Sequence, residues 1–436
     1  MKKTIQLCYC LLICLGMISS GWSHAAEPVL REKLLNALVS GDDGYLEKTL
    51  NGVQQDFEHN RQNNTALSDT YYSFNYLQRE MDAALASRRL NDWVTHYPNS
   101  YAAKTVRGMF LSDKAFQARG NKFAADTTDA QFTEMRKWYT LAKRDLLTSL
   151  KLTPYPLISR IRLYNIATVE SDDRAKQTHF LAAYKMAPTS MQLHREVLIS
   201  LTPRWGGSYE AMQAYINKIS PGLDSNKNKN VLQSMIIEDK ASNLIAKKQY
   251  EEAYTLYNEA IELRDSSNYL CKRAYLGSLL KKPALSILSD LKIAATKNVP
   301  DPYCATMAAH FARSNISLPD AVPLLDSYIT YFPRNADLYN AKGWVYQEKG
   351  DKVSAFPALM KSAELGDAWG QTMAGKYLFS GWGGTTDRVK ALTLLKAAAE
   401  QGEPNAQLSV VQALDILERP EEARLAEQHY ATMNKR

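Results

Sequence analysis

The feature that most constrains this chain is a sequence period of about 34 residues. Proline, or an acidic residue in its place, marks the period at intervals of 33 to 36 residues, with one interval of 44. The marks are Pro154, Pro188, Pro221, Asp265, Pro300, Pro333, Asp367 and Glu403. Small residues stand five positions before five of them, at Ala183, Ala260, Ala295, Ser362 and Ala398. A fixed period of this length is typical of stacked helix pairs. We therefore predict an all-α chain that forms an α-solenoid of antiparallel helix pairs.

The spacing of apolar residues favours the same fold. Apolar residues recur at positions i, i+3, i+4 and i+7 through nearly all of the chain, whereas the alternation of a strand is scarce. A chain of 436 residues is too long for one ordinary hydrophobic core. A solenoid avoids that limit because each repeat packs only on its neighbours.

The one long interval requires an insertion, and the polar run from Gly222 to Asn230 supplies it. A run so low in apolar residues is typical of a loop. We predict a linker over residues 223–230. It would separate an N-terminal helical domain, residues 26–222, from a repeat domain, residues 231–436.

The N-terminus has the three parts of a secretory signal peptide. Lys2 and Lys3 precede an apolar run from Leu7 to Ile18, and Ser23 and Ala25 suit the cleavage site. We predict that residues 1–25 are removed on export to the periplasm of a bacterium or beyond it. The alternative is a membrane anchor, but the run of 12 residues is shorter than the ~20 that a spanning helix needs. No other run approaches that length, so we expect no transmembrane segment in the mature chain.

Charge and motifs exclude several classes of function. The formal net charge of +7 is mild for 436 residues and does not indicate a nucleic-acid partner. The sequence has no Gly-x-Ser-x-Gly elbow, no phosphate-binding loop and no pair of histidines four residues apart. We therefore predict no enzyme, no cofactor and no metal site. The oligomeric state does not follow from the sequence.

Two segments resemble tetratricopeptide repeats, residues 234–265 and residues 336–367. In the second, the small residues Gly343 and Ala355 would let two helices approach closely. Residues 367–402 are similar to a Sel-one-like repeat, with a turn over Gly381 to Gly384 and Asp387 as a helix cap. These resemblances imply a solenoid whose first helices line a concave face.

That resemblance also implies which side chains line the concave groove. Carried over by position, they are Tyr303, His310, Arg313, Asn340, Trp344 and Gln347. Aromatic, amide and guanidinium groups together suit a peptide or a sugar, because they combine ring stacking with fork-shaped hydrogen bonds. The alternative is that these side chains form ordinary solvated surface.

The segment Arg204, Trp205, Gly206, Gly207 and Ser208 has two interpretations. In the first, the glycine N–H groups bind an anion that Arg204 pairs with. In the second, the glycines form a turn, Ser208 caps the next helix and Trp205 packs between helices.

The same segment carries a second resemblance. Together with Trp93 to Ser100 and Ala115 to Gly120, it resembles an uncharacterised bacterial family, domain of unknown function 4034, over residues 70–225. That family implies no activity.

Cys271 and Cys304 are the two cysteines that follow the signal peptide, and they lie 33 residues apart. An oxidising compartment favours a disulfide between them. Equivalent positions on neighbouring helices are about 8–10 Å apart, which is more than a disulfide spans. The sequence leaves their pairing open.

These observations predict a non-catalytic, exported scaffold of the cell envelope that binds a protein, or a cell-wall glycan, on its concave face. One alternative is a small-ligand receptor or enzyme centred on Arg204 to Ser208. It would place the Gly206–Gly207 turn at a pocket with converging polar groups. The other alternative is a structural spacer in an envelope or secretion complex.

Overall fold

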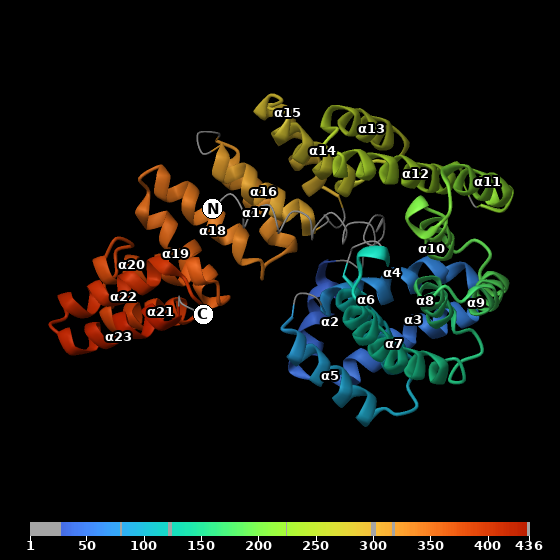
Figure 1. Cartoon of the computed structure of the whole chain (residues 1–436), viewed down its shortest axis with the longest axis horizontal. Helices are drawn as coiled ribbons and strands as arrows, with labels where there is room; N and C mark the ends of the chain where they lie inside the picture. The colour runs from blue at the N-terminus through green and yellow to red at the C-terminus, as the bar shows by residue number, and fades with distance from the viewer. Residues whose placement is uncertain are drawn as a thin grey trace. The chain divides into compact units, whose positions relative to one another are not determined.

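The computed structural model describes residues 28–78, 81–120, 124–223, 225–297, 302–315 and 319–433. These residues form 22 α-helices and four short 3-10 helices, and they contain no strand (Figure 1). The predicted signal peptide, residues 1–25, lies outside the described residues. In the part of the chain that is described, no helix has both the length and the hydropathy to cross a bilayer.

The chain divides into two compact units, Met1–Tyr269 and Leu270–Arg436. The predicted linker over 223–230 is therefore not where the units separate, and most of it is helical. Ser225 begins a helix by accepting a hydrogen bond from the Asn228 N–H at 3.3 Å. Because this cap satisfies the first turn, the polar residues that follow form exposed helix rather than loop.

The first unit is built from the helices that precede the division. They are α2 (Pro28–Ser40), α3 (Asp43–His59), α4 (Asn64–Leu77), α5 (Ala83–His96), α6 (Tyr101–Arg119), α7 (Asp129–Ser149), α8 (Leu157–Val169), α9 (Asp173–Met186), α10 (Met191–Ser200), α11 (Tyr209–Ile219), α12 (Asn226–Ala246) and α13 (Tyr250–Leu263). The short helices are η1 (Arg61–Asn63), η3 (Ala124–Asp126), η4 (Pro203–Trp205) and η5 (Ser220–Gly222). From α6 onward, α6, α8, α10 and α12 are the first helices of successive pairs, and each contacts the next.

The longest pair shows how the sequence sets helix packing. Ser100 caps α6, and Gly120 ends it with a positive φ of 73°, which glycine adopts readily because it has no Cβ. Within α6, a Cβ added at Gly108 would lie 2.7 Å from Leu146 Cγ of α7. The absent side chain therefore lets the two helices approach closely.

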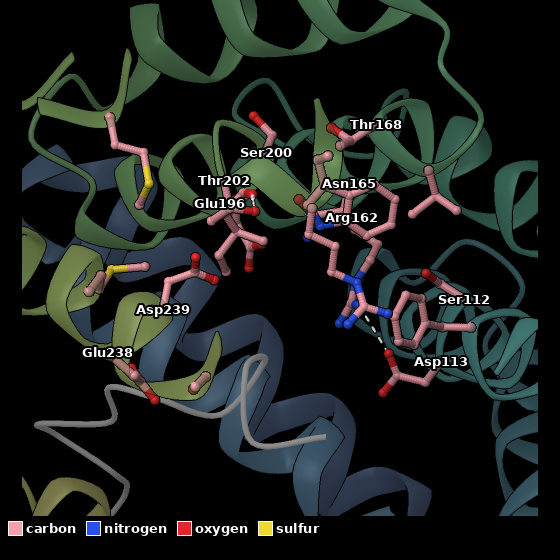
Figure 2. Close-up of a pocket in the computed structure, with 18 of the residues that line it drawn as sticks. Ser112, Asp113, Arg162, Asn165, Thr168, Glu196, Ser200, Thr202, Glu238 and Asp239 are labelled. Atoms are coloured by element: carbon pink, nitrogen blue, oxygen red, sulfur yellow. Dashed lines mark hydrogen bonds and ion pairs between the residues drawn. The ribbon is translucent and has the colours of Figure 1, made fainter. Parts of the chain in front are cut away.

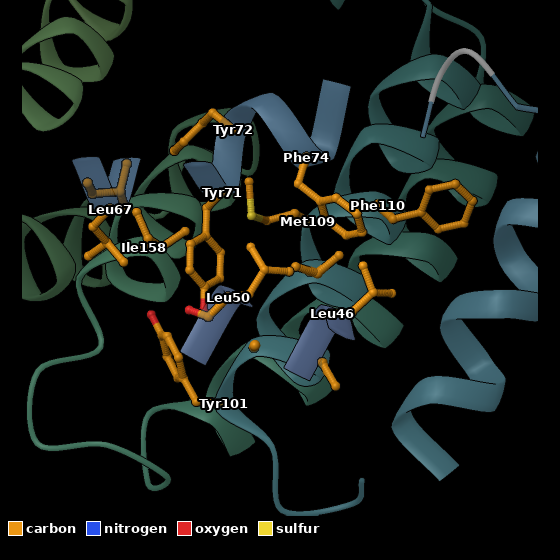
Figure 3. Packing of buried hydrophobic residues seen from close by; sticks show 14 of the residues in the cluster. Leu46, Leu50, Leu67, Tyr71, Tyr72, Phe74, Tyr101, Met109, Phe110 and Ile158 are labelled. Atoms are coloured by element: carbon orange, nitrogen blue, oxygen red, sulfur yellow. The ribbon is translucent and has the colours of Figure 1, made fainter. Parts of the chain in front are cut away.

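The core of the first unit joins α3, α4, α6 and α8 (Figure 3). Tyr71 of α4 is fully buried, and its hydroxyl donates to the Leu50 carbonyl of α3 at 3.2 Å. Its ring lies 6.1 Å from that of Tyr101. Buried aromatic residues contribute much of the burial energy of a core, so this cluster holds the amino-terminal helices together.

The second unit is also built from successive helices that pack on their neighbours. Its helices are α14 (Ser267–Leu279), within which the division falls, α15 (Ala284–Ala295), α16 (Pro302–Ser314), α17 (Ala321–Tyr331), α18 (Ala336–Glu348), α19 (Lys352–Glu364), α20 (Ala368–Ser380), α21 (Arg388–Glu400), α22 (Pro404–Ile416) and α23 (Pro420–Met433). The sequence marks Pro333, Asp367 and Glu403 lie just before α18, α20 and α22. The period is thus one helix pair, and the predicted solenoid is confirmed.

The predicted small-residue contacts are present in the second unit. A Cβ at Gly343 of α18 would lie 2.6 Å from Leu359 Cδ2 of α19. A Cβ at Gly375 of α20 would likewise lie 2.8 Å from Leu395 Cγ of α21. As predicted, Asp387 caps α21, accepting a hydrogen bond from the Lys390 N–H at 2.9 Å.

Candidate functional site

A mainly apolar pocket with several charged side chains in its lining lies in the first unit, among the first helices α6, α8, α10 and α12. It encloses about 1130 Å³, including its open mouth. Its charged lining residues are Asp113, Arg162, Glu196, Arg204, Glu238 and Asp239. Four carboxylates and two guanidinium groups thus converge on one space, which is the arrangement expected of a binding site.

Arg162 of α8 is one of the buried charges in this lining, and its guanidinium reaches into the pocket (Figure 2). Its Nη1 donates to Asp113 Oδ1 at 3.0 Å, and Asn75 donates to the other Asp113 oxygen at 2.8 Å. Its Nε is buried and has no hydrogen-bond partner. A buried donor without an acceptor costs about 1–3 kcal/mol, a cost that the ion pair with Asp113 helps to offset.

Glu196 of α10 lies between Arg162 and the opposite wall. Gln192 donates to Glu196 Oε1 at 2.7 Å. Burial raises the pKa of the Glu196 carboxyl, and the positive charges of Arg162 and Arg195 oppose that rise. A further positive charge in the pocket would stabilise the carboxylate form.

Glu238 and Asp239 of α12 lie across the open space from Arg162 (Figure 2). Asp239 Oδ2 accepts hydrogen bonds from the Tyr209 hydroxyl at 2.8 Å and from Asn243 at 3.2 Å. Burial raises the pKa of Asp239, and neighbouring Glu238 adds to the rise. The hydrogen bonds to Asp239 and the positive charge of Arg204 oppose that rise in pKa.

Each of the two predicted interpretations of the segment from Arg204 to Ser208 is right only in part. The N–H groups of Gly206 and Gly207 donate to the carbonyls of Pro203 and Thr202, both at 3.1 Å, so they do not face an anion. Ser208 caps α11 by accepting from the Ala211 N–H at 3.1 Å. The predicted anion site on the glycines is thus wrong, because the turn uses those donors itself.

Arg204 and Trp205 nevertheless line the pocket. The second interpretation placed Trp205 in a core position between helices. In the structure Trp205 is only half-buried. The Arg119 guanidinium carbon lies 5.6 Å from the centre of its ring. The segment therefore contributes to the pocket through these two side chains rather than through its glycines.

The predicted groove residues lie on first helices of the second unit, but most of them contact the next first helix. Arg313 of α16 forms an ion pair with Asp337 of α18. Asn340 was predicted to line the groove. It is buried instead, and it donates to Asp367 Oδ1 at 2.8 Å. Because first helices in successive repeats pack on one another, their polar side chains pair across the repeat boundary.

The aromatic groove residues behave in the same way. The ring of Trp344 lies 6.0 Å from that of Trp369, and the ring of Tyr303 lies 6.4 Å from that of Tyr275. Gln347 accepts a hydrogen bond from Tyr377 at 3.4 Å. His310 is exposed. Its pKa is lowered by partial burial and by the neighbouring positive charge of Arg313.

Cys271 and Cys304 form a disulfide between α14 and α16, with a Cα–Cα distance of 5.3 Å. Both residues are fully buried. The two helices therefore approach more closely at this point than the spacing expected from the repeat. Among the described residues, no group of three or more His, Cys, Asp or Glu side chains is placed to hold a metal ion.

Sequence reasoning missed most of the pocket residues. Arg162 follows Ile161 and precedes Leu163, and Glu238 follows two isoleucines. A charge inside an otherwise apolar helical run is the available signal, because such charges are buried only when paired or functional.

Three solved structures are similar to this chain. A protective antigen of uropathogenic Escherichia coli strains that displays an SLR fold is 14% identical, with 88% of this chain and 94% of that chain covered and a TM-score of 0.36. Yeast Tom70 is 13% identical, with 92% of each chain covered and a TM-score of 0.32. The P58(IPK) TPR domain is 15% identical, with 80% and 98% covered and a TM-score of 0.21.

No curated protein sequence matches this chain significantly. A family model does match part of it. The match begins before the expected residue 70, at residue 43, and ends at residue 172, before the Arg204 segment. It spans helices α3 to α8 and thus includes Asp113 and Arg162 of the pocket. Residues 43–172 match the model of the family described as Domain of unknown function (DUF4034), the family that the sequence resemblance predicted.

Proposed function

We propose that this chain is a non-catalytic binding protein of the bacterial cell envelope, exported by a signal peptide over residues 1–25. It holds a segment of a partner protein along the first helices of its repeats. The pocket of the first unit is the main point of recognition. The observation that carries this proposal is the convergence of six charged side chains on a pocket built from four successive first helices.

The environment of the carboxylates supports binding rather than catalysis. Asp113 accepts from Arg162 and Asn75, Glu196 from Gln192, and Asp239 from Tyr209 and Asn243. Side chains held by fixed partners suit recognition of a preformed ligand shape. A general base needs a free oxygen aimed at a substrate proton.

The test is partner capture by a variant with a filled pocket. Thr168 lines the pocket, is half-buried and donates to the Tyr164 carbonyl at 3.0 Å. Thr178 makes the same bond to Arg174, at 2.8 Å, on the exposed side of α9. Thr168→Trp should fill the pocket, whereas the matched control Thr178→Trp should not.

We expect wild type and Thr178→Trp to capture the same protein from periplasmic extract, identified by mass spectrometry, and Thr168→Trp to lose it. Capture that survives in Thr168→Trp would overturn the proposed role of the pocket. Intact-mass measurement of the periplasmic protein tests the export step. It should show a chain that begins near Ala26, and full-length protein in the inner membrane would contradict it.

The pocket itself also favours a second candidate, a receptor for a free small molecule. Arg204 and Trp205, which precede the Gly206–Gly207 turn, line it, although the glycines themselves do not. Native mass spectrometry of the purified protein distinguishes the two. A retained small molecule that Thr168→Trp loses, without capture of any protein, would favour the receptor.

A further inference from the structure

Resting on the proposed function, we infer that the partner segment inserts an uncharged aromatic side chain into this pocket. The ring packs against Trp205 and Phe116, and the backbone of the segment stays at the mouth. The proposal thus names a peptide with an aromatic anchor as the ligand class.

The charges around the pocket balance, so the pocket favours neither a cation nor an anion. The lining carries four carboxylates and two guanidinium groups. Two further arginines lie next to it. Arg119 has its guanidinium carbon 5.6 Å from the centre of the Trp205 ring, and Arg195 attracts both Glu196 and Glu238. Four negative charges are thus matched by four positive ones.

Each carboxylate of the lining also has a positive neighbour of its own. Asp113 pairs with Arg162 at 3.0 Å, and Arg204 stabilises the charged form of Asp239. Arg195 does the same for the remaining two carboxylates. A charged ligand would therefore enter without an unused partner of opposite sign, and burying such a charge is costly. An uncharged ligand avoids that cost.

Apolar side chains supply much of the lining surface that a ligand can reach. Phe116, Val169, Ile199 and Trp205 line the pocket, and each of them is only half-buried. They belong to α6, α8, α10 and η4, so one inserted group contacts four elements of the fold. Covering this surface removes it from water, which is the main favourable contribution to the binding of an apolar group.

The composition of this surface favours an aromatic ring over an aliphatic group. Trp205 and Phe116 offer rings, which pair with a further ring in offset or edge-on geometry. Met235 also lines the pocket, and methionine sulfur makes favourable contacts with aromatic rings. The Trp205 ring already has a cation beside it in Arg119, so a ligand cation gains less there than a ring does.

The test is isothermal titration of the mature protein with capped alanine–X–alanine tripeptides, in which X is phenylalanine, cyclohexylalanine, lysine or glutamate. Cyclohexylalanine is the matched control, because it keeps the size and apolar character of phenylalanine and lacks the aromatic ring. We expect the phenylalanine peptide to bind at least about twofold more tightly than the cyclohexylalanine peptide. It should bind at least about tenfold more tightly than the two charged peptides. Its affinity should be the same at about 0.05 M and about 0.5 M salt, since no new ion pair forms.

Variants locate the bound ring. Trp205→Leu keeps an apolar group and removes the ring, so it should remove most of the preference for phenylalanine over cyclohexylalanine. Trp382→Leu, the same change at an exposed position of the second unit, should leave that preference unaltered. Thr168→Trp should abolish binding of the phenylalanine peptide, and Thr178→Trp should not.

Each variant is first checked by circular dichroism and melting, and Phe116→Leu replaces Trp205→Leu if that variant does not fold. Binding of any other peptide as tightly as the phenylalanine peptide would overturn the inference, as would phenylalanine binding that survives Thr168→Trp. So would free benzyl alcohol that binds as tightly as the phenylalanine peptide, because it would identify a small aromatic molecule rather than a peptide as the ligand. If no peptide binds while Thr168→Trp still abolishes partner capture, the ligand class is wrong and the proposed function stands. If no peptide binds and Thr168→Trp captures normally, both are wrong.

Discussion

Arg162 and Asp113 form an ion pair between α8 and α6 in which the side chains are only 8% and 14% exposed. The pair anchors one wall of the pocket and ties together two first helices. It also holds the guanidinium at the lining of the pocket. Stability and recognition therefore depend on the same side chain.

Arg162→Gln should destabilise the first unit by about 3–5 kcal/mol, because it leaves the Asp113 carboxylate buried without its cation. The double change Arg162→Gln with Asp113→Asn should recover much of that loss, since no charge is then stranded. Urea denaturation of the three proteins measures both effects. Equal stability of Arg162→Gln and wild type would show that the pair is not buried in solution.

Gly207→Ala should destabilise more than Gly206→Ala. A Cβ at Gly207 would lie 2.1 Å from the Leu201 carbonyl oxygen, so the backbone must shift, at a cost of about 1–3 kcal/mol or more. Gly206 has φ of 84° but open space around its Cα, so alanine there costs about 1–2 kcal/mol of backbone strain alone. Thermal melting of both variants checks the order, and the reverse order would contradict the turn geometry.

Asp69 of α4 should make stability depend on pH. Burial raises the pKa of its carboxyl from 3.8 to about 7, although Arg195 opposes the rise. Between these values the folded chain holds a proton that the unfolded chain has lost, so this group lowers stability as pH rises from about 4 to about 7. Asp69→Asn should therefore stabilise the protein at pH 8 and have little effect at pH 4.

Denaturation of Asp69→Asn at several pH values tests this dependence. Asp56→Asn, a change of the same kind at an exposed position of α3, is the control. A gain at pH 8 no larger than that of the control would show that Asp69 is not held in a desolvated site.

The double change Trp344→Ala with Arg313→Ala should lower the melting temperature of the second unit. Trp344 packs against Trp369, and such ring contacts contribute about 0.5–1.5 kcal/mol beyond the area they bury. Arg313 adds its ion pair with Asp337. His310→Ala, at an exposed position of α16, should leave melting unchanged. If melting is unchanged in the double variant, these side chains are free for a partner and the groove regains its predicted role.

Sequence reasoning succeeded where the information is local. Gly343 revealed a close helix contact because only a small residue tolerates a neighbour such as Leu359. The linker failed because polar composition predicted a loop, while one cap, Ser225, was enough to continue the chain as helix.

The groove and the pocket depend on information that one repeat does not contain. The helical face of Asn340 could be predicted, but its partner Asp367 belongs to the next repeat, and only the stacking distance brings them together. Arg162 and Asp239 lie on α8 and α12, which three further α-helices separate along the chain. Their approach follows from the stacking of α8 and α12 on α10, which local spacing does not encode.

The Cys271–Cys304 disulfide makes the two ends of the second unit differ in how firmly they are held. In a solenoid each repeat contacts only its neighbours, so thermal opening begins at whichever end is least secured. The bond fastens α14 to α16 at the amino-terminal edge of this unit, whereas α23 at the other edge is held by packing and by the exposed contact of His429 with Glu400 of α21, without a covalent link. Under heat or mechanical load the helices should therefore peel away from α23 backwards, and the covalently closed edge should be the last part to open.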